Sequence, residues 1–166
     1  MKKKILAALT AMIMTFGAAA MPGEVAADLL NAAGIAQTAE ALESWDYGYE
    51  NLDDGTVAIT GYTGSATELV IPSEIGGKKV THIGYSAFYD CDSLTSITIP
   101  DSVTHIGDRA FYDCDSLTSI TIPDSVTDIG YSAFAGCTSL TSITIPDSVT
   151  DIGHSAFNDC TSLTSI

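Results

Sequence analysis

The sequence predicts a repeat solenoid built from 23-residue units, and two observations lead to this fold class. The string from Ala87 to Pro100 returns at 110–123 and, with minor changes, at 133–146, before it begins again at Ala156. A fixed period of this size is typical of chains in which each unit is too small to bury its own apolar face, so that the units must stack. Apolar residues make up 46% of the chain, which is enough for a continuous core.

Each unit begins with a short strand. Leu94, Ile97 and Ile99 follow the pattern Leu-x-x-Leu-x-Leu of leucine-rich repeats. Alternation along the strand directs Ile97 and Ile99 into the core and leaves the residues between them outside. Pro100 lacks an N–H and should end the strand. Stacking therefore predicts short parallel strands on a concave face.

The remainder of each unit returns the chain to its starting side. Val103 and Ile106 are expected to re-enter the core before Gly107 breaks the direction. The following Ala-Phe-x-x-Cys segment, which starts at Ala110, has the spacing of a single helical turn. We therefore expect short helical turns or strands opposite the concave face.

The complete unit, Ala-Phe-x-x-Cys-x-Ser-Leu-Thr-Ser-Ile-Thr-Ile-Pro-Asp-Ser-Val-Thr-x-Ile-Gly, resembles the BspA-type leucine-rich repeats of bacterial cell-surface proteins. The resemblance covers roughly residues 62–166 and includes an irregular first unit with the sequence Gly-Lys-Lys-Val-Thr-x-Ile-Gly. One position departs from the common leucine-rich pattern: serine stands where Asn or Cys is usual, at Ser102, Ser125 and Ser148. The resemblance implies surface display and adhesion to host or matrix proteins, without fixed binding residues.

Residues 1–27 have the pattern of a signal peptide. Lys2, Lys3 and Lys4 form a positive start, an apolar stretch runs over residues 5–20, and small residues suited to cleavage follow at 18–20 or 25–27. The apolar stretch is short for a membrane-spanning helix, although an uncleaved anchor is the alternative. The sequence thus predicts a secreted or cell-surface protein.

Three further segments follow the leader. Residues 28–44 are Ala-rich and are expected to form a linker or a short helix. Residues 45–67 are predicted to be an N-terminal cap, because two strand-like runs flank an Asp54-Gly55 pair that suits a β-hairpin turn. Residues 68–166 hold the leucine-rich repeats. The last unit stops inside its strand at Ile166, which favours a C-terminally incomplete chain and, second, self-association through an open end.

The charge balance excludes two classes of partner. The chain carries 21 acidic and six basic residues, a formal charge of −15, and three of the six basic residues lie in the leader. Binding to phosphates requires clustered Lys and Arg. We therefore expect no nucleic-acid partner and no contact with membranes beyond the signal peptide.

The outward-facing strand positions are the predicted partner-binding surface. Alternation places a column of serines and a column of threonines on the concave face, at Ser96, Thr98, Ser119, Thr121, Ser142 and Thr144. The alternative is that these hydroxyls only keep an exposed strand face soluble, since Thr is also a good strand residue. The face carries no aromatic side chain, which argues against sugar binding.

Cysteines recur at the repeat spacing, at Cys91, Cys114, Cys137 and Cys160. In an exported protein disulfides are one interpretation. Parallel stacking, however, points neighbouring Cβ atoms the same way, which favours free thiols in the core. The sequence holds no Cys-x-x-Cys pair for zinc.

Two groups of polar side chains could form metal sites but have simpler interpretations. Stacked aspartates, such as Asp101, Asp124 and Asp147, could attract calcium but are expected to form a solvated acidic rim. His82 and His105 share a column with two aspartates, Asp128 and Asp151, which repeat copying explains without a metal. We therefore assign no metal and no cofactor.

No motif of an enzyme is present, and every acid, hydroxyl and thiol recurs in register, as structural residues do. The sequence therefore predicts an exported, non-enzymatic module that binds an extracellular protein or mediates adhesion. The alternatives are a non-catalytic targeting region of a larger secreted enzyme and a self-associating structural protein of the surface.

Overall fold

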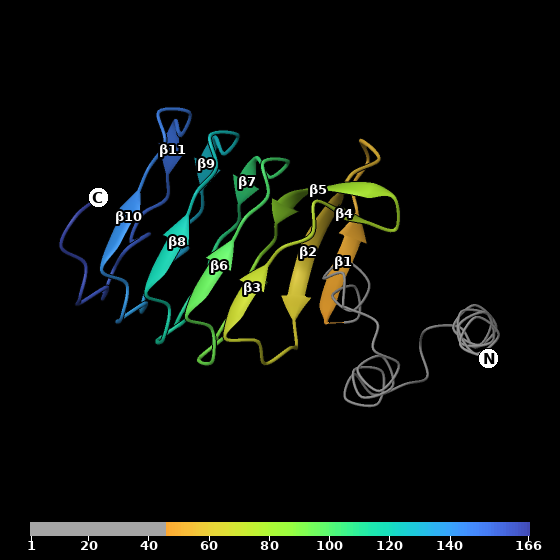
Figure 1. The fold of residues 1–166 in the computed structure, drawn as a ribbon. Coiled ribbons are helices and arrows are strands. Elements are labelled where there is room, and N and C mark those ends of the chain that lie inside the picture. The colour runs from red at the N-terminus through yellow and green to blue at the C-terminus, as the bar shows by residue number, and fades with distance from the viewer. Residues whose placement is uncertain (1–45) are drawn as a thin grey trace, which may run out of the picture. The chain divides into compact units, whose positions relative to one another are not determined.

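The computed structural model describes residues 46–166, which form a β-solenoid (Figure 1). The predicted signal peptide at 1–27 and the segment 28–44 lie outside the described residues. Repeating units of 23 residues wind into coils, and each regular coil contributes one strand to each of two columns. The predicted fold class, a repeat solenoid, is confirmed. The two columns of strands lie on opposite sides of the coils.

The first sheet begins with an antiparallel hairpin and continues as a parallel ladder. Its strands β1, β2, β5, β7, β9 and β11 are neighbours in that order, and β4 pairs with β5 at one side. Their bounds are Tyr47–Asn51, Val57–Tyr62, Lys78–Ile83, His105–Ile106, Asp128–Ile129 and Asp151–Ile152, with β4 at Glu74–Ile75. The hairpin of β1 and β2 falls within the predicted cap, whose boundary at residue 67 stays a prediction.

The second sheet is parallel throughout and contains one strand from each coil. Its order is β10-β8-β6-β3, with bounds Ser142–Thr144, Ser119–Thr121, Ser96–Thr98 and Glu68–Val70. The register is that of the sequence repeat, so that Ile97 lies beside Ile120, and Ile120 beside Ile143. A single bridge between Ser142 and Ser165 extends the ladder.

A column of phenylalanines fills the core between the strands and the turns. Phe88, Phe111, Phe134 and Phe157 stack face to face, with ring centroids 5.1, 5.3 and 5.5 Å apart. This spacing is close to the separation of about 4.8 Å between neighbouring strands. Tyr62 of the hairpin continues the column at 5.5 Å from Phe88. The stacked rings therefore repeat at nearly the same spacing as the hydrogen-bonded strands.

The expected helical turn is replaced by a run of tight turns. The N–H groups of Ala87 and Tyr89 bond three residues back within their coil, but those of Ser86, Phe88 and Asp90 donate to carbonyls of the next coil. Alternate donors therefore lie outside any helix. Positive φ angles at two positions of each turn, such as 52° at Ser86 and 59° at Asp90, direct these groups toward the neighbouring coil. Carbonyl groups of the neighbouring coil satisfy these N–H donors better than a single isolated helical turn could.

Backbones of adjacent coils approach closely at the glycine that follows each of the strands β5, β7, β9 and β11. A Cβ atom on Gly130 would lie 2.5 Å from the backbone nitrogen of Asp108 and from the carbonyl carbon of Gly107. No side chain can be accommodated there without displacing a coil. This explains why the repeat carries Gly at this position in each coil.

Candidate protein-docking surface

The six residues predicted to bind a partner lie together on the second sheet. Parallel pairing sets Ser96, Ser119 and Ser142 side by side. It does the same for Thr98, Thr121 and Thr144. All are exposed except Ser96, which is half-buried, and the isoleucine between each pair is buried. The structure thus brings the predicted residues into one polar surface, which we call the serine–threonine face.

The hydroxyls of this face are not used inside the protein. Within residues 46–166 none of the six side-chain hydroxyls makes a hydrogen bond to another described residue. The threonines that precede these strands behave differently, because the Oγ1 of Thr118 donates to the carbonyl of Thr95 at 3.0 Å and that of Thr164 to Thr141 at 3.1 Å. The hydroxyls of the serine–threonine face are therefore available for hydrogen bonds to water or to another molecule.

Strand β3 adds two residues that the sequence interpretation left out. Glu68 pairs beside Ser96, and Val70 beside Thr98, so both extend the serine–threonine face toward the hairpin. Val70 is 55% exposed, which gives this edge an apolar position. The signal was present in the sequence, since Leu69 and Ile71-Pro72 match the repeat pattern.

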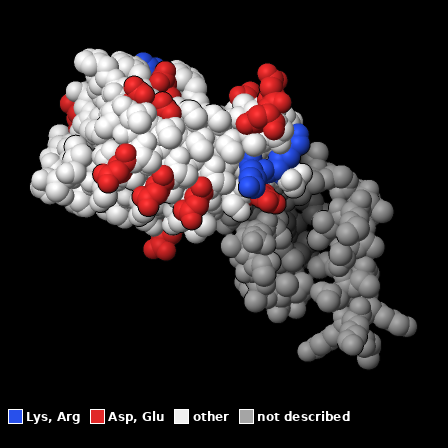
Figure 2. All heavy atoms as spheres, turned by 90° about the horizontal axis from the view of Figure 1, so that it is seen from above, with Lys and Arg blue, Asp and Glu red and all other residues white. Residues whose placement is uncertain are grey.

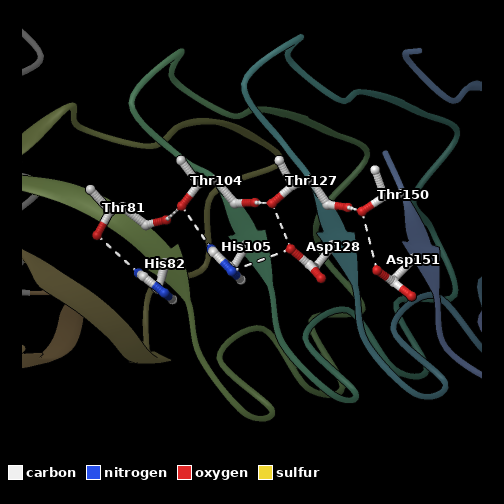
Figure 3. A network of polar contacts seen from close by, with 8 residues as sticks. All are labelled: Thr81, His82, Thr104, His105, Thr127, Asp128, Thr150 and Asp151. Atoms are coloured by element: carbon white, nitrogen blue, oxygen red, sulfur yellow. Dashed lines mark hydrogen bonds and ion pairs between the residues drawn. The ribbon is translucent and has the colours of Figure 1, made fainter. Parts of the chain in front are cut away.

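The opposite column carries a hydrogen-bonded ladder of threonines (Figure 3). The Oγ1 atoms of Thr104, Thr127 and Thr150 each lie 3.2–3.3 Å from the carbonyl oxygen of the threonine one coil earlier. Each hydroxyl also lies beside the side chain of the residue that follows it. For Thr127 that contact, to Oδ2 of Asp128, is 2.5 Å long. These hydroxyls, unlike those of the serine–threonine face, tie one coil to the next.

The two histidines of this column stack on each other. The rings of His82 and His105 lie 4.5 Å apart with an interplanar angle of 8°, and Nε2 of His105 is 3.3 Å from Oδ2 of Asp128. Burial, followed by the neighbouring His105, lowers the pKa of His82. Among residues 46–166 no group of three His, Cys, Asp or Glu side chains could hold a metal ion. The threonines and histidines of this column therefore link neighbouring coils through hydrogen bonds and ring stacking.

The cysteines are free thiols, as predicted, and three of the four are buried. Each buried thiol donates to the phenylalanine carbonyl one coil earlier; Cys114, for example, lies 3.0 Å from the oxygen of Phe88. Hydrogen bonding to Cys137, and then burial, raises the pKa of Cys114. The thiol of Cys114 therefore remains a protonated donor. Sequence reasoning placed the cysteines in the core but missed this bond, because nothing in the repeat identifies its acceptor.

Negative charge is spread along the solenoid (Figure 2). Acidic side chains recur at even spacing on the face shown, and the basic side chains gather mainly at one end. Asp101, Asp124 and Asp147 are all exposed. Of the described residues only Lys78, Lys79 and Arg109 are basic. No helix that is long and apolar enough to cross a membrane occurs within the described range.

Comparison with protein families identifies a repeat that matches this geometry. Residues 62–166 match the model of the BspA type leucine-rich repeat region, in six copies. This range starts at the end of β2 and includes the whole second sheet. A comparison with curated proteins found no match.

Solved bacterial structures share the fold. A leucine-rich repeat protein of T. pallidum is 31% identical with a TM-score of 0.59, over 72% of this chain and 67% of the other. A leucine-rich cell surface protein of Faecalibacterium prausnitzii is 33% identical (TM-score 0.59), and a leucine-rich repeat protein of Bacteroides ovatus is 34% identical (TM-score 0.58). Each match covers 72% of this chain, but the chain spans only 40% and 39% of those two proteins.

Proposed function

Because this chain belongs to the BspA-type leucine-rich-repeat family of bacterial proteins, we propose that it binds an extracellular protein through the serine–threonine face. Proteins built from such repeats generally present a rigid surface to partners. They are generally not catalytic, and the module proposed here is likewise not an enzyme. The role within that class is adhesion or docking outside the cell.

The observation that carries this proposal is the difference between the hydroxyl columns. Thr104, Thr127 and Thr150 are consumed by contacts between coils, whereas Thr98 and Thr121 leave their hydroxyls to solvent. Strands held on both sides by parallel neighbours lose little conformational freedom when a partner docks, which lowers the cost of binding. The surface is also held in register by a buried isoleucine under every pair of hydroxyls.

A location on the cell surface is part of the same proposal. The neighbour from Faecalibacterium prausnitzii is described as a cell surface protein, which supports this location for a relative of the chain. The positive and apolar pattern of residues 1–27 agrees with export. The experiment is fractionation of the producing cells, with the repeats detected by antibody in the wall and culture fractions; detection only in the cytoplasm would contradict export.

A second candidate follows from length. Two of the solved relatives are much longer than this chain, which covers about two fifths of each. A targeting region attached to a secreted enzyme is therefore the alternative function. Reading the gene beyond Ile166 tests it, and a hydrolase or peptidase domain there would favour it over free adhesion.

The docking surface is tested by adding charge to it. The triple variant Thr98→Lys, Thr121→Lys, Thr144→Lys should weaken binding to immobilised extracellular matrix proteins by about tenfold or more, because three buried ammonium groups would need partners across the interface. The matched control is Ser93→Lys, Ser116→Lys, Ser139→Lys, which adds the same charge on the turns. Equal losses in both variants, or no loss in the first, would contradict the proposed face.

A further inference from the structure

The serine–threonine face is a regular lattice of hydroxyl groups. Its serine column and its threonine column both run along the solenoid axis, since the strands that carry them are parallel and in register. Neighbouring hydroxyls within a column follow the strand spacing of about 4.8 Å, and the two columns lie about 6.6 Å apart along each strand. Within the described part of the chain these hydroxyls have no hydrogen-bond partner. An occupant must therefore offer polar atoms that repeat along the same axis.

The repeat of the lattice distinguishes between the regular conformations of a peptide chain. Two coils, such as those of Thr98 and Thr144, advance about 9.6 Å along the axis. Three residues of a polyproline II helix advance about 9.3 Å, so one side of such a helix returns to the face at every second coil. An α-helix, with a pitch of about 5.4 Å, drifts by about 1.2 Å over the same distance. An extended strand repeats at about 6.6–6.8 Å and matches neither one coil nor two.

The hydrogen-bonding groups of the face select the same conformation. A serine or threonine hydroxyl donates one hydrogen bond, for which a backbone carbonyl oxygen is a suitable acceptor. The carbonyl oxygens of an α-helix are already bonded within the helix, whereas a polyproline II helix makes no internal hydrogen bonds. Sites for polyproline II helices are commonly lined by aromatic rings. The serine–threonine face has no ring, so hydrogen bonds to the backbone would take the place of ring packing.

The charge beside the face indicates which side chains the occupant carries. Asp101, Asp124 and Asp147 each follow by three residues the threonine that ends a strand of the second sheet, and all three are exposed. Glu68 adds an exposed carboxylate on β3. No strand of this sheet carries a basic residue. A segment with basic and without acidic side chains therefore complements this side of the solenoid.

We propose that the serine–threonine face binds a single-chain, proline-rich segment of the protein partner, which lies along the solenoid axis as a polyproline II helix with a lysine or arginine at every third position. Its basic side chains would follow one side of the helix at intervals of about 9.3 Å. They would pair with carboxylates two coils apart, at Asp101 and Asp147, while backbone carbonyl oxygens accept from the threonine hydroxyls. This inference rests on the proposed function and names the chemistry of its partner.

The test is an NMR titration of the threonine-methyl-labelled full chain with a peptide of three Pro-Pro-Lys repeats. We expect saturable shifts at the methyls of Thr98, Thr121 and Thr144, which weaken as salt is added. The matched control is a peptide of six prolines followed by three lysines, which has the same composition but does not place its lysines on one side of the helix. It should bind at least about fivefold more weakly. Equal affinity of the two peptides, or shifts confined to other threonines, would overturn the proposal.

Two further peptides separate conformation from charge. Three Gly-Ser-Lys repeats carry the same charge on a flexible chain, which must be ordered on binding, so their affinity should be at least about fivefold lower. Three Pro-Pro-Glu repeats should cause no shifts at the face, because their carboxylates would meet the aspartates. Binding of either peptide as tight as that of the Pro-Pro-Lys repeats would overturn the proposal. Tighter binding of a triple-helical peptide of Gly-Pro-Pro repeats would overturn it in favour of a collagen-like occupant.

The hydroxyl contacts are tested by a variant that replaces the threonines of the face with an isosteric residue: Thr98→Val, Thr121→Val, Thr144→Val. Its affinity for the Pro-Pro-Lys repeats should fall about fivefold or more, because three donors are lost. The matched control removes as many hydroxyls from the turns: Ser93→Ala, Ser116→Ala, Ser139→Ala. It should keep the affinity within about twofold. Unchanged affinity in the folded valine variant, or equal losses in the two variants, would overturn the proposal.

The carboxylate contacts are tested by a variant that keeps the size of the side chains: Asp101→Asn, Asp124→Asn, Asp147→Asn. The wild-type chain should bind three Pro-Pro-Lys repeats severalfold more tightly than three Pro-Pro-Gln repeats, and the variant should bind both alike. The three aspartates are exposed, so the fold should accept the change. An unchanged preference for lysine in the folded variant would overturn the proposed pairing.

Peptide binding and matrix binding can fail separately. The variant Thr98→Lys, Thr121→Lys, Thr144→Lys should lose both, because the added ammonium groups repel a basic segment. Loss of matrix binding in this variant, with no peptide shifts at the face of the wild-type chain, would reject the polyproline II occupant and keep the proposed function. Peptide shifts at the face, with matrix binding unaffected by the lysines, would reject the matrix protein as partner and keep the polyproline II occupant.

Discussion

Two columns of threonines, built from the same 23-residue unit, have opposite roles. In the first sheet the hydroxyls of Thr104, Thr127 and Thr150 each lie 3.2–3.3 Å from a carbonyl oxygen of the preceding coil and also contact the side chain that follows them. In the second sheet those of Thr98 and Thr121 make no bond within the described residues. Residue type does not distinguish the columns. Position within the coil decides whether a hydroxyl contacts the preceding coil or stays exposed to solvent.

Substitutions in the threonine ladder should change stability, whereas substitutions in the serine–threonine face should change the proposed binding. A repeat multiplies every contact by the number of coils, so a small difference between positions becomes measurable when all copies are changed together. The first sheet should therefore tolerate few substitutions, and the serine–threonine face should tolerate many. Four predictions test this difference, from the largest expected effect on stability to the smallest.

The backbones of adjacent coils lie very close together beside the ladder, at Gly130. Gly130→Ala should destabilise the protein by about 3 kcal/mol or more, because the added Cβ meets backbone atoms that cannot move independently. Urea unfolding measures this value. Gly61→Ala in β2 is the control, since nothing lies within 4 Å of a Cβ there. Equal losses of stability in the two variants would show that the close approach of the backbones is not the reason for glycine at this position.

Removing the ladder hydroxyls should have the second-largest effect. The triple variant Thr104→Val, Thr127→Val, Thr150→Val should lose about 2–3 kcal/mol, at about 1 kcal/mol for each hydrogen bond. Valine keeps the branched shape, so that packing changes little. The measurement is the urea midpoint at constant m-value. A loss below the experimental error would mean that water satisfies the freed carbonyl oxygens without any loss of stability.

Acid should weaken the ladder further through His82. Its pKa is lowered in the folded protein by burial and by His105, so the unfolded chain binds the proton more tightly. Stability is therefore fully present above the unfolded pKa of about 6.5 and declines as the pH falls below it toward the folded value. Urea unfolding between pH 7.5 and about pH 5 measures the slope. His82→Gln should reduce this slope, and an unchanged slope would contradict the account.

The smallest change in stability is expected on the serine–threonine face. Thr98→Val, Thr121→Val, Thr144→Val should alter the free energy of unfolding by no more than about 0.5 kcal/mol, because no internal hydrogen bond is removed and valine favours strands equally. Circular dichroism during thermal unfolding checks this variant. A loss as large as that of the ladder variant would remove the distinction between the two columns.

The period of the sequence was sufficient to predict the solenoid, the parallel strands and the inward direction of Ile97 and Ile99. These follow from apolar spacing, which depends only on local geometry. Free cysteines were predicted because parallel stacking points neighbouring Cβ atoms the same way. The position of the six candidate residues on neighbouring strands also follows from the repeat, whereas their role in binding stays a prediction.

Features that depend on the neighbouring coil could not be predicted. The turn around Phe88 was expected to be helical, but its donors reach the carbonyl of Ala110 in the next coil. The thiol bond of Cys114 likewise has its acceptor in another coil. Spacing within one unit says nothing about such partners.

We expect a partner to contact the second sheet and not the threonine ladder. Threonine methyl groups report on both columns, so the most direct measurement is cross-saturation NMR on threonine-methyl-labelled protein bound to an unlabelled matrix protein. The account predicts transfer to the methyls of Thr98, Thr121 and Thr144 and none to those of Thr104, Thr127 and Thr150. Transfer confined to the ladder would contradict it.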